Sequence, residues 1–261
     1  MSAFVRKIIM FNSTRVCIFV DGENLRHSIG NLFPEFNRSD YLPKTDWGNF
    51  FDWIACEVAG PEADRIRTYW YVIQHIDFSP YNLNFARDEK DFLKIKNIFS
   101  RDPEFLDRIN KTKPENQNKL LEELITDFQR SQATMQKRFS GWVNIQNEIA
   151  RKYKAIEFRR AGSIRYDLFN GNFGSEKAVD VKLATDLISL KDIYDIAVIV
   201  SGDQDYVPAV AAIKDLGKRT VNVSFLTENE RLLPGGAKRL NQSTDWSMEI
   251  KYSDSKRFLG F

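Results

Sequence analysis

The sequence predicts an α/β protein built on a mostly parallel β-sheet. Short runs rich in Val, Ile, Phe and Tyr alternate with helical patterns along the 261 residues. The runs at 16–20 (VCIFV) and 195–200 (DIAVIV) are almost entirely apolar, which is typical of strands that helices cover on both faces. Strands that alternate with helices form βαβ units, so we expect a doubly wound, Rossmann-like sheet.

Five strands are expected in this sheet, at 16–20, 66–73, 155–159, 195–200 and 219–225. The helices between them are expected at 46–58, 177–190 and 206–216. Asp46 is expected to cap the first helix, and Gly217 to end the last, where Pro208 falls in the first turn. The segment 226–261 is expected to form one or two short helices and a tail.

Residues 79–153 interrupt the alternation with charged sequence of helical periodicity. Asp102-Pro103 and Lys113-Pro114 predict breaks between its helices. We therefore expect a core of residues 1–78 and 154–261 with a helical insertion at 79–153 in the same domain. From 87 to 160, Lys and Arg outnumber Asp and Glu by 17 to 12, whereas the remainder has 21 against 24. This separation suits a bound polyanion; a solvated helical surface of mixed charge is the alternative.

Composition excludes several classes of protein. A net charge of +2 gives no argument for nucleic-acid binding, and 43% hydrophobic residues suffice for a full core. Two cysteines make neither a disulfide framework nor a zinc site. No apolar run approaches the roughly 20 residues of a membrane span, and neither a secretory signal nor a glycine-rich nucleotide loop is evident. A cytoplasmic protein without membrane association is expected.

Aspartates follow the predicted strands. Asp21 comes directly after the first strand, Asp203 and Asp205 come directly after the fourth, and Asp180 opens the helix after the third. In a doubly wound sheet the first and fourth strands are neighbours, and their carboxyl ends open on one crevice. We therefore expect these side chains to meet.

Carboxylates that meet in a cleft either have raised pKa values or share a cation. Ligand sets made only of oxygen favour Mg²⁺ or Mn²⁺, so Asp21, Asp180, Asp203 and Asp205 are the expected metal ligands and catalytic residues. Each also has a structural alternative. Asp21 can be a turn residue and Asp203 a helix cap, while Asp180 and Asp205 can favour helix dipoles.

Basic and aromatic residues follow the third strand. Arg159, Arg160 and Arg165 are expected to bind substrate phosphates. The aromatic residues Tyr166, Phe169 and Phe173 then lie in a segment rich in Gly and Asn. They are expected either to stack on unpaired bases or to fold into the core.

Three motifs, VDGENL at 20–25, KAVDVKLATDL at 177–187 and SGDQDYVPAVAAIKDLGKRTVNVSF at 201–225, together resemble the NYN domain of the LabA-like family, relatives of PIN-domain nucleases. The resemblance covers about 14–75 and 155–250, and Leu240, Asp245 and Trp246 are similar to its closing pattern. It implies a PIN-like fold, dependence on Mg²⁺ or Mn²⁺, and cleavage of RNA to 5′-phosphate and 3′-hydroxyl ends. It also implies that Asn24 and Ser201 orient the metal ligands or the scissile phosphate. Asp186 and Lys182 either assist the site or lie on the helix surface, and the helix surface is the expected place.

The leading hypothesis is a metal-dependent ribonuclease, an endoribonuclease above all, acting on single-stranded or structured RNA, tRNA included. A non-catalytic RNA-binding or regulatory module is one alternative, and a nucleotide or phosphate-ester hydrolase is another. Glu23 stands where a haloacid-dehalogenase-like phosphatase requires Asp, which argues against that class. The insertion is expected to contact a protein partner or a second copy of the chain.

Overall fold

The structure, a computed structural model, describes residues 13–36, 41–81, 83–235 and 237–261. The chain divides into two compact units. The first unit comprises Met1–Val72, Ile145–Ala161 and Val179–Phe261, and the second comprises Ile73–Asn144 and Gly162–Ala178.

Eight strands form the sheet of the described chain, in the order β4-β3-β2-β1-β5-β6-β7, with β8 paired to β6. Their bounds are β1 (Thr14–Asp21), β2 (Ala63–Ser79), β3 (Ile156–Asp167), β4 (Asn172–Lys177), β5 (Ile196–Val200), β6 (Arg219–Leu226), β7 (Leu232–Leu233) and β8 (Trp246–Ile250). The expected α/β class is confirmed, but the expectation of five strands was wrong. Strand β4 is polar and almost wholly exposed, and β7 has only two residues. Strand β8 lies in the segment that was expected to form helices and a tail. None of the three has the long apolar run from which a buried strand is predicted.

The sheet is mixed because β4 pairs antiparallel with β3, and β7 antiparallel with β6. Its centre is parallel, as expected. Strand β1 lies between β2 and β5, with Asp21 opposite Tyr71 and Val20 opposite Val200. The neighbouring positions predicted for the first and fourth strands are therefore confirmed, and the carboxyl ends of β1 and β5 are adjacent.

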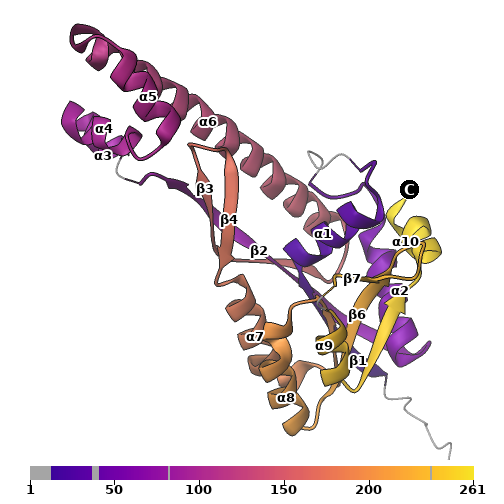
Figure 1. Cartoon of the computed structure of the whole chain (residues 1–261). Helices are drawn as coiled ribbons and strands as arrows, with labels where there is room; N and C mark the ends of the chain where they lie inside the picture. Colours follow the sequence, from indigo (N-terminus) through magenta and orange to yellow (C-terminus); the bar gives the residue numbers. More distant parts are fainter. Residues whose placement is uncertain (1–12, 37–40, 82, 236) are drawn as a thin grey trace, which may run out of the picture. The chain divides into compact units, whose positions relative to one another are not determined.

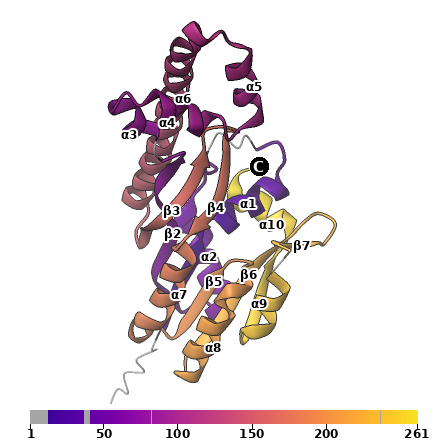
Figure 2. The same cartoon turned by 60° about the vertical axis from the view of Figure 1, so that its left-hand side comes forward.

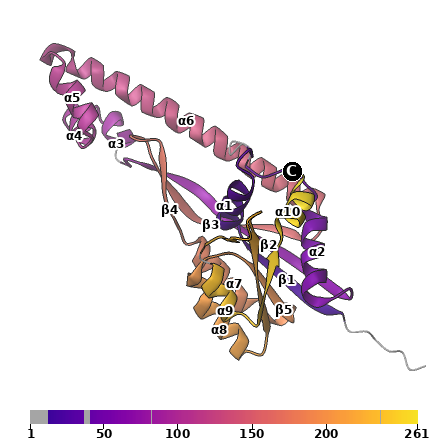
Figure 3. The ribbon, with the colours of Figure 1, turned by 45° about the vertical axis from the view of Figure 1, so that its right-hand side comes forward.

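Helices cover both faces of the sheet in the first unit (Figures 1 and 2). Helices α1 (Gly22–Leu32), α2 (Trp47–Ala59) and α10 (Tyr252–Leu259) lie on one face, over Val16, Ile18 and Val20 of β1. Figure 3 shows α10 beside α2. Helices α7 (Val179–Ser189), α8 (Val207–Asp215) and α9 (Ala237–Ser243) lie together on the other face. The short 3₁₀ helices are η1 (Lys191–Ile193) and η2 (Gln204–Tyr206).

The predicted helix ends are confirmed by local hydrogen bonds and backbone angles. The Asp46 carboxylate caps α2 by accepting from the Asn49 amide at 2.9 Å. Pro208 stands in the first turn of α8, and Gly217 follows this helix in the left-handed region at φ +76°.

The second unit contains α3 (Leu83–Asp88), α4 (Phe92–Phe99), α5 (Pro103–Lys111), most of α6 (Pro114–Lys152), the ends of β2 and β3, and β4. The predicted breaks are confirmed, since Pro103 and Pro114 begin α5 and α6. Phe169 packs on Phe128 with ring centroids 5.1 Å apart, and Tyr166 packs on Phe78 at 5.9 Å. These two aromatic residues are partly buried and pack against the core of this unit. No helix in the described ranges combines the length and hydrophobicity that a membrane crossing requires.

Candidate metal centre

Asp21 lies at the point where β1 passes into α1, and the residue is 6% exposed. One oxygen accepts from the Asn24 backbone amide at 3.1 Å, so Asp21 caps α1. The other accepts from Asn24 Nδ2 at 2.7 Å, Ser201 Oγ at 2.9 Å and the Tyr206 hydroxyl at 3.2 Å. Burial raises the pKa of Asp21, and these neutral donors offset the rise only in part.

Asn24 and Ser201 join the ends of β1 and β5. The Asn24 side chain donates to Asp21 and accepts from the Gly202 backbone amide at 3.2 Å. Ser201 donates to Asp21, and its hydroxyl oxygen accepts from the Asp203 backbone amide at 3.0 Å. The ends of β1 and β5, predicted to be adjacent, are thus joined by a continuous series of hydrogen bonds.

Gly202 is required by close packing at this edge. A Cβ atom there would lie 2.0 Å from Cγ of Pro234, far inside van der Waals contact. The glycine between Ser201 and Asp203 therefore lets the β7 region approach the end of β5.

Asp180 and Asp203 lie near the same point, half-buried. Asp203 caps η2 by accepting from the Asp205 backbone amide at 2.9 Å, and Asp180 stands in the first turn of α7, which packs beside η2 and β1. Burial raises the pKa of the Tyr206 hydroxyl, and the charges of Asp21, Asp203 and Asp180 raise it further. The charges of three of the predicted acids thus affect the buried Tyr206 phenol, whereas the Asp205 side chain is exposed to solvent.

The donor chemistry of this edge fits a hard divalent cation. Its groups are carboxylates, hydroxyls and an amide, and Asp21 is buried among neutral donors. In the part of the chain that the structure describes, however, no three His, Cys, Asp or Glu side chains are grouped closely enough to hold a metal ion. A shared ion would therefore require a change in the side-chain positions of Asp180 and Asp203.

Glu23 belongs to the same motif but is already paired with Arg26 and contacts His27. It contacts Arg26 at 2.5 Å and His27 at 3.0 Å. Burial alone would raise its pKa, but the hydrogen bonds from His27 and Arg26 outweigh burial and lower the pKa to about 2. Glu23 is therefore a poor candidate for a metal ligand.

Comparison with known protein families gives a match over residues 107–235, to the NYN domain. The NYN resemblance is confirmed. NYN domains belong to the PIN-like nuclease superfamily, and the match contains Asp180 and Asp203 but leaves out Asp21. A search of curated proteins found no match. A crystal structure of a protein of unknown function from Vibrio parahaemolyticus is 17% identical, with a TM-score of 0.43 over 91% of this chain and 93% of that chain.

Asp186, inside the NYN match, corrects a sequence-based expectation. It was expected on the helix surface, but it is 3% exposed. Its carboxylate accepts from the Tyr71 hydroxyl at 2.9 Å, from Lys182 Nζ at 2.8 Å and from Arg159 Nη1. Burial raises its pKa, but these donors outweigh burial and lower it.

The predicted substrate arginines are divided between the units. In the first unit, Arg159 binds Asp186 and Glu157 and lies 4.1 Å from the Tyr69 ring centroid, and Arg160 donates to Gln146 and Asn147. In the second unit, Arg165 donates to Ser79 Oγ at 2.6 Å. Their roles toward a substrate stay predictions.

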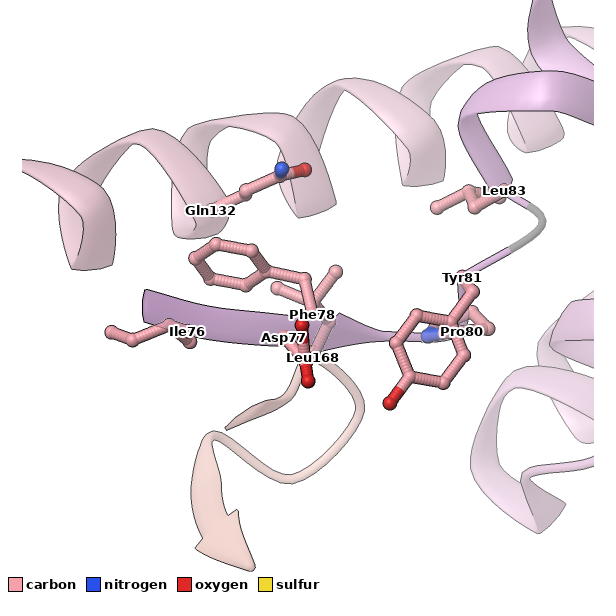
Figure 4. Close-up of a pocket in the computed structure, with 8 residues that line it drawn as sticks. All are labelled: Ile76, Asp77, Phe78, Pro80, Tyr81, Leu83, Gln132 and Leu168. Carbon is pink, nitrogen blue, oxygen red and sulfur yellow. The ribbon is translucent and has the colours of Figure 1, made fainter. Parts of the chain in front are cut away.

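A cavity of about 210 Å³ lies within the second unit (Figure 4). Gln132 of α6 reaches toward Phe78 of β2, while Tyr81 and Leu83 line the end of the cavity beyond the strand. Tyr81 is 61% exposed, and the Arg165 guanidinium lies 6.0 Å from its ring centroid. None of the predicted metal ligands lines this cavity.

Two functional candidates, Tyr206 and Tyr71, were missed from the sequence. Tyr206 ends the SGDQDY motif, so its place beside the aspartates could have been suggested by that motif. Tyr71 is one aromatic among several in its strand, and only the register places it opposite Asp21. Asp245, part of the closing pattern, accepts from the backbone amide of Thr220 at 2.7 Å and from its hydroxyl at 3.0 Å, which joins the segment before β8 to β6.

Proposed function

We propose that this protein is a metal-dependent ribonuclease that hydrolyses RNA phosphodiester bonds as an endonuclease. The observation that supports it most is the environment of Asp21, a buried carboxylate held only by neutral donors beside Asp180 and Asp203. A cation binding there would compensate this charge. The NYN match supports the choice of nuclease over other hydrolases.

In this proposal Asp21, Asp180 and Asp203 hold Mg²⁺ or Mn²⁺. The exposed Asp205 is the fourth proposed ligand and approaches the ion from the solvent side. The bound ion would supply an activated water and neutralise charge on the phosphodiester. Asn24 and Ser201 fix the direction of the Asp21 carboxylate through the bonds described above. The oxygen that receives three donors is thereby oriented toward the end of β5.

Arg159, Arg160 and Arg165 remain the proposed RNA contacts, with unequal freedom. Arg159 already binds two carboxylates, so its first role is structural. Arg160 and Arg165 donate to neutral acceptors, which a phosphate oxygen would displace more readily.

The proposal is tested by incubating the purified protein with mixed RNA and DNA substrates in Mn²⁺, in Mg²⁺ or with a chelator. We expect cleavage of RNA that the chelator abolishes and that Asp203→Asn lowers about a hundredfold or more, with RNA binding retained. Asp192→Asn, at an exposed aspartate paired with Lys191, is the matched control and should cleave like the wild type. Unchanged cleavage by Asp203→Asn would refute the assignment of the site.

The absence of a grouped set of ligands in the described chain favours one competing function, a non-catalytic RNA-binding module. Such a module would bind RNA equally with metal or chelator and would cleave no substrate. The same incubation, followed by electrophoretic mobility measurements, separates the two functions.

A further inference from the structure

We infer that Asp186 is a positioning residue that fixes helix α7, and with it Asp180, relative to Asp21 at the end of β1. This inference rests on the proposed metal site and adds a residue to its support. Asp186 does not touch the proposed cation; it acts through the helix that it shares with Asp180.

Asp186 joins α7 to neighbouring strands of the sheet through one buried and one partly buried contact. The Tyr71 hydroxyl of β2 and Nη1 of Arg159 of β3 both donate to its Oδ2. Its Oδ1 accepts from Lys182, one turn earlier in α7, at 2.8 Å. The donors from β2 and β3 restrict both sliding and rotation of the helix, because either motion would leave a buried charge without these partners.

The register connects this joint to the proposed site. Tyr71 is the residue of β2 that lies opposite Asp21 of β1. A Cβ atom on Gly22 would lie 2.4 Å from the carbonyl oxygen of Tyr71, so the Asp21–Gly22 step packs directly on the Tyr71 backbone. Tyr71 thus touches β1 through its backbone and α7 through its hydroxyl, and it fixes the height of Asp180 relative to Asp21.

Arg159 makes the joint rigid. Its guanidinium lies 4.1 Å from the Tyr69 ring centroid and also binds Glu157, so it has little freedom to follow a displaced helix. A bound cation tolerates misplacement of its ligands poorly, and residues that orient ligands typically contribute roughly 10- to 100-fold to metal affinity.

The test is a Mn²⁺ titration of the full chain, with free Mn²⁺ followed by electron paramagnetic resonance. We expect Asp186→Asn to weaken Mn²⁺ binding about tenfold or more. Tyr71→Phe, which removes one hydroxyl, should weaken it severalfold, and the control Asp192→Asn should leave it unchanged. Thermal melting of each variant identifies any that fails to fold, and Tyr71→Phe decides the matter if Asp186→Asn does not.

A double variant separates positioning from general stabilisation. If Asp186 acts through Asp180, Asp186→Asn should add no further loss of Mn²⁺ affinity in an Asp180→Asn background. Additive losses would overturn the inference, as would wild-type affinity in folded Asp186→Asn and Tyr71→Phe. Wild-type protein that binds no Mn²⁺ would overturn the proposed metal site as well, so the two failures are distinguishable.

Discussion

Asp21 and Asp186 are buried aspartates of the same unit, 6% and 3% exposed, and each accepts a hydrogen bond from a buried tyrosine. They differ in the charge of their other donors. Asp21 is held by an asparagine and a serine, whereas Asp186 is held by an arginine and a lysine. Burial raises the pKa of both, but only at Asp186 do the partners reverse the shift.

The difference shows how burial with cations and burial without them serve separate purposes. A buried carboxylate that is paired with a cation holds elements together, because removing one partner leaves the other as an uncompensated charge in the protein interior. The charge of a buried carboxylate among neutral donors is not compensated, so its pKa is raised unless a cation binds. Asp21 therefore has the environment of a ligand, and Asp186 that of a support.

Replacing Asp21 by Asn should have the largest effect. We expect RNA cleavage to fall by about a hundredfold or more, since a bound cation contributes several kcal/mol of charge stabilisation. Mn²⁺ should raise the melting temperature of the wild type but not of this variant. Single-turnover cleavage and thermal melts measure both effects. Glu23→Gln is the neighbouring control, and an equal loss there would remove the distinction between the two acids.

Replacing Arg159 by Met should destabilise the fold by about 3 kcal/mol, because it leaves Asp186 buried with one cation fewer. Arg160→Met should cost under about 1 kcal/mol, since Arg160 donates to neutral amides. Urea unfolding of both variants tests the contrast. A stable Arg159→Met that cleaves RNA poorly would instead favour a direct phosphate contact.

Replacing Gly202 by Ala should displace the Asp203 loop, because the new Cβ would collide with Pro234. We expect a loss of about 2 kcal/mol in the free energy of unfolding, together with weaker Mn²⁺ binding. Gly141→Ala is the control: its Cβ would meet nothing within 4 Å, and helical Ala should stabilise slightly. Equal stability of the two variants would contradict the close packing at this edge.

The smallest expected effects are opposite pH dependences at Asp21 and Glu23, measured without metal. The pKa of Asp21 is raised from 3.8, so the stability that it contributes relative to Asp21→Asn is lost as pH rises through the raised pKa. The pKa of Glu23 is lowered from 4.5 to about 2, so its contribution relative to Glu23→Gln is present above 4.5 and lost as pH falls toward about 2. Urea unfolding across about pH 2–7 should show both slopes, and parallel slopes would refute the contrast.

The parallel centre of the sheet follows from the amino-acid sequence, and so does the adjacency of the strand ends that carry Asp21 and Asp203. The apolar runs of β1 and β5 require cover on both faces, and parallel strands bring their carboxyl ends to one edge, so Asp21 and Asp203 were predictable. Strands β4 and β8 were not predictable from the sequence. Both are largely exposed, and their pairing depends on backbone contacts rather than on an apolar pattern.

Which charges are compensated depends on contacts between elements that are distant in sequence. Arg159, Lys182 and Asp186 lie on different turns and elements, and the bonds from Arg159 and Tyr71 form only when β2 and β3 pack against α7. The helical spacing places Asp186 on the same side of α7 as Val179 and Leu183, but neither periodicity nor composition identifies its partners on other strands. The ionisation of a buried acid depends on such partners. The sequence therefore identifies the acids, but only the packing shows that Asp21 has the environment of a ligand and Asp186 that of a support.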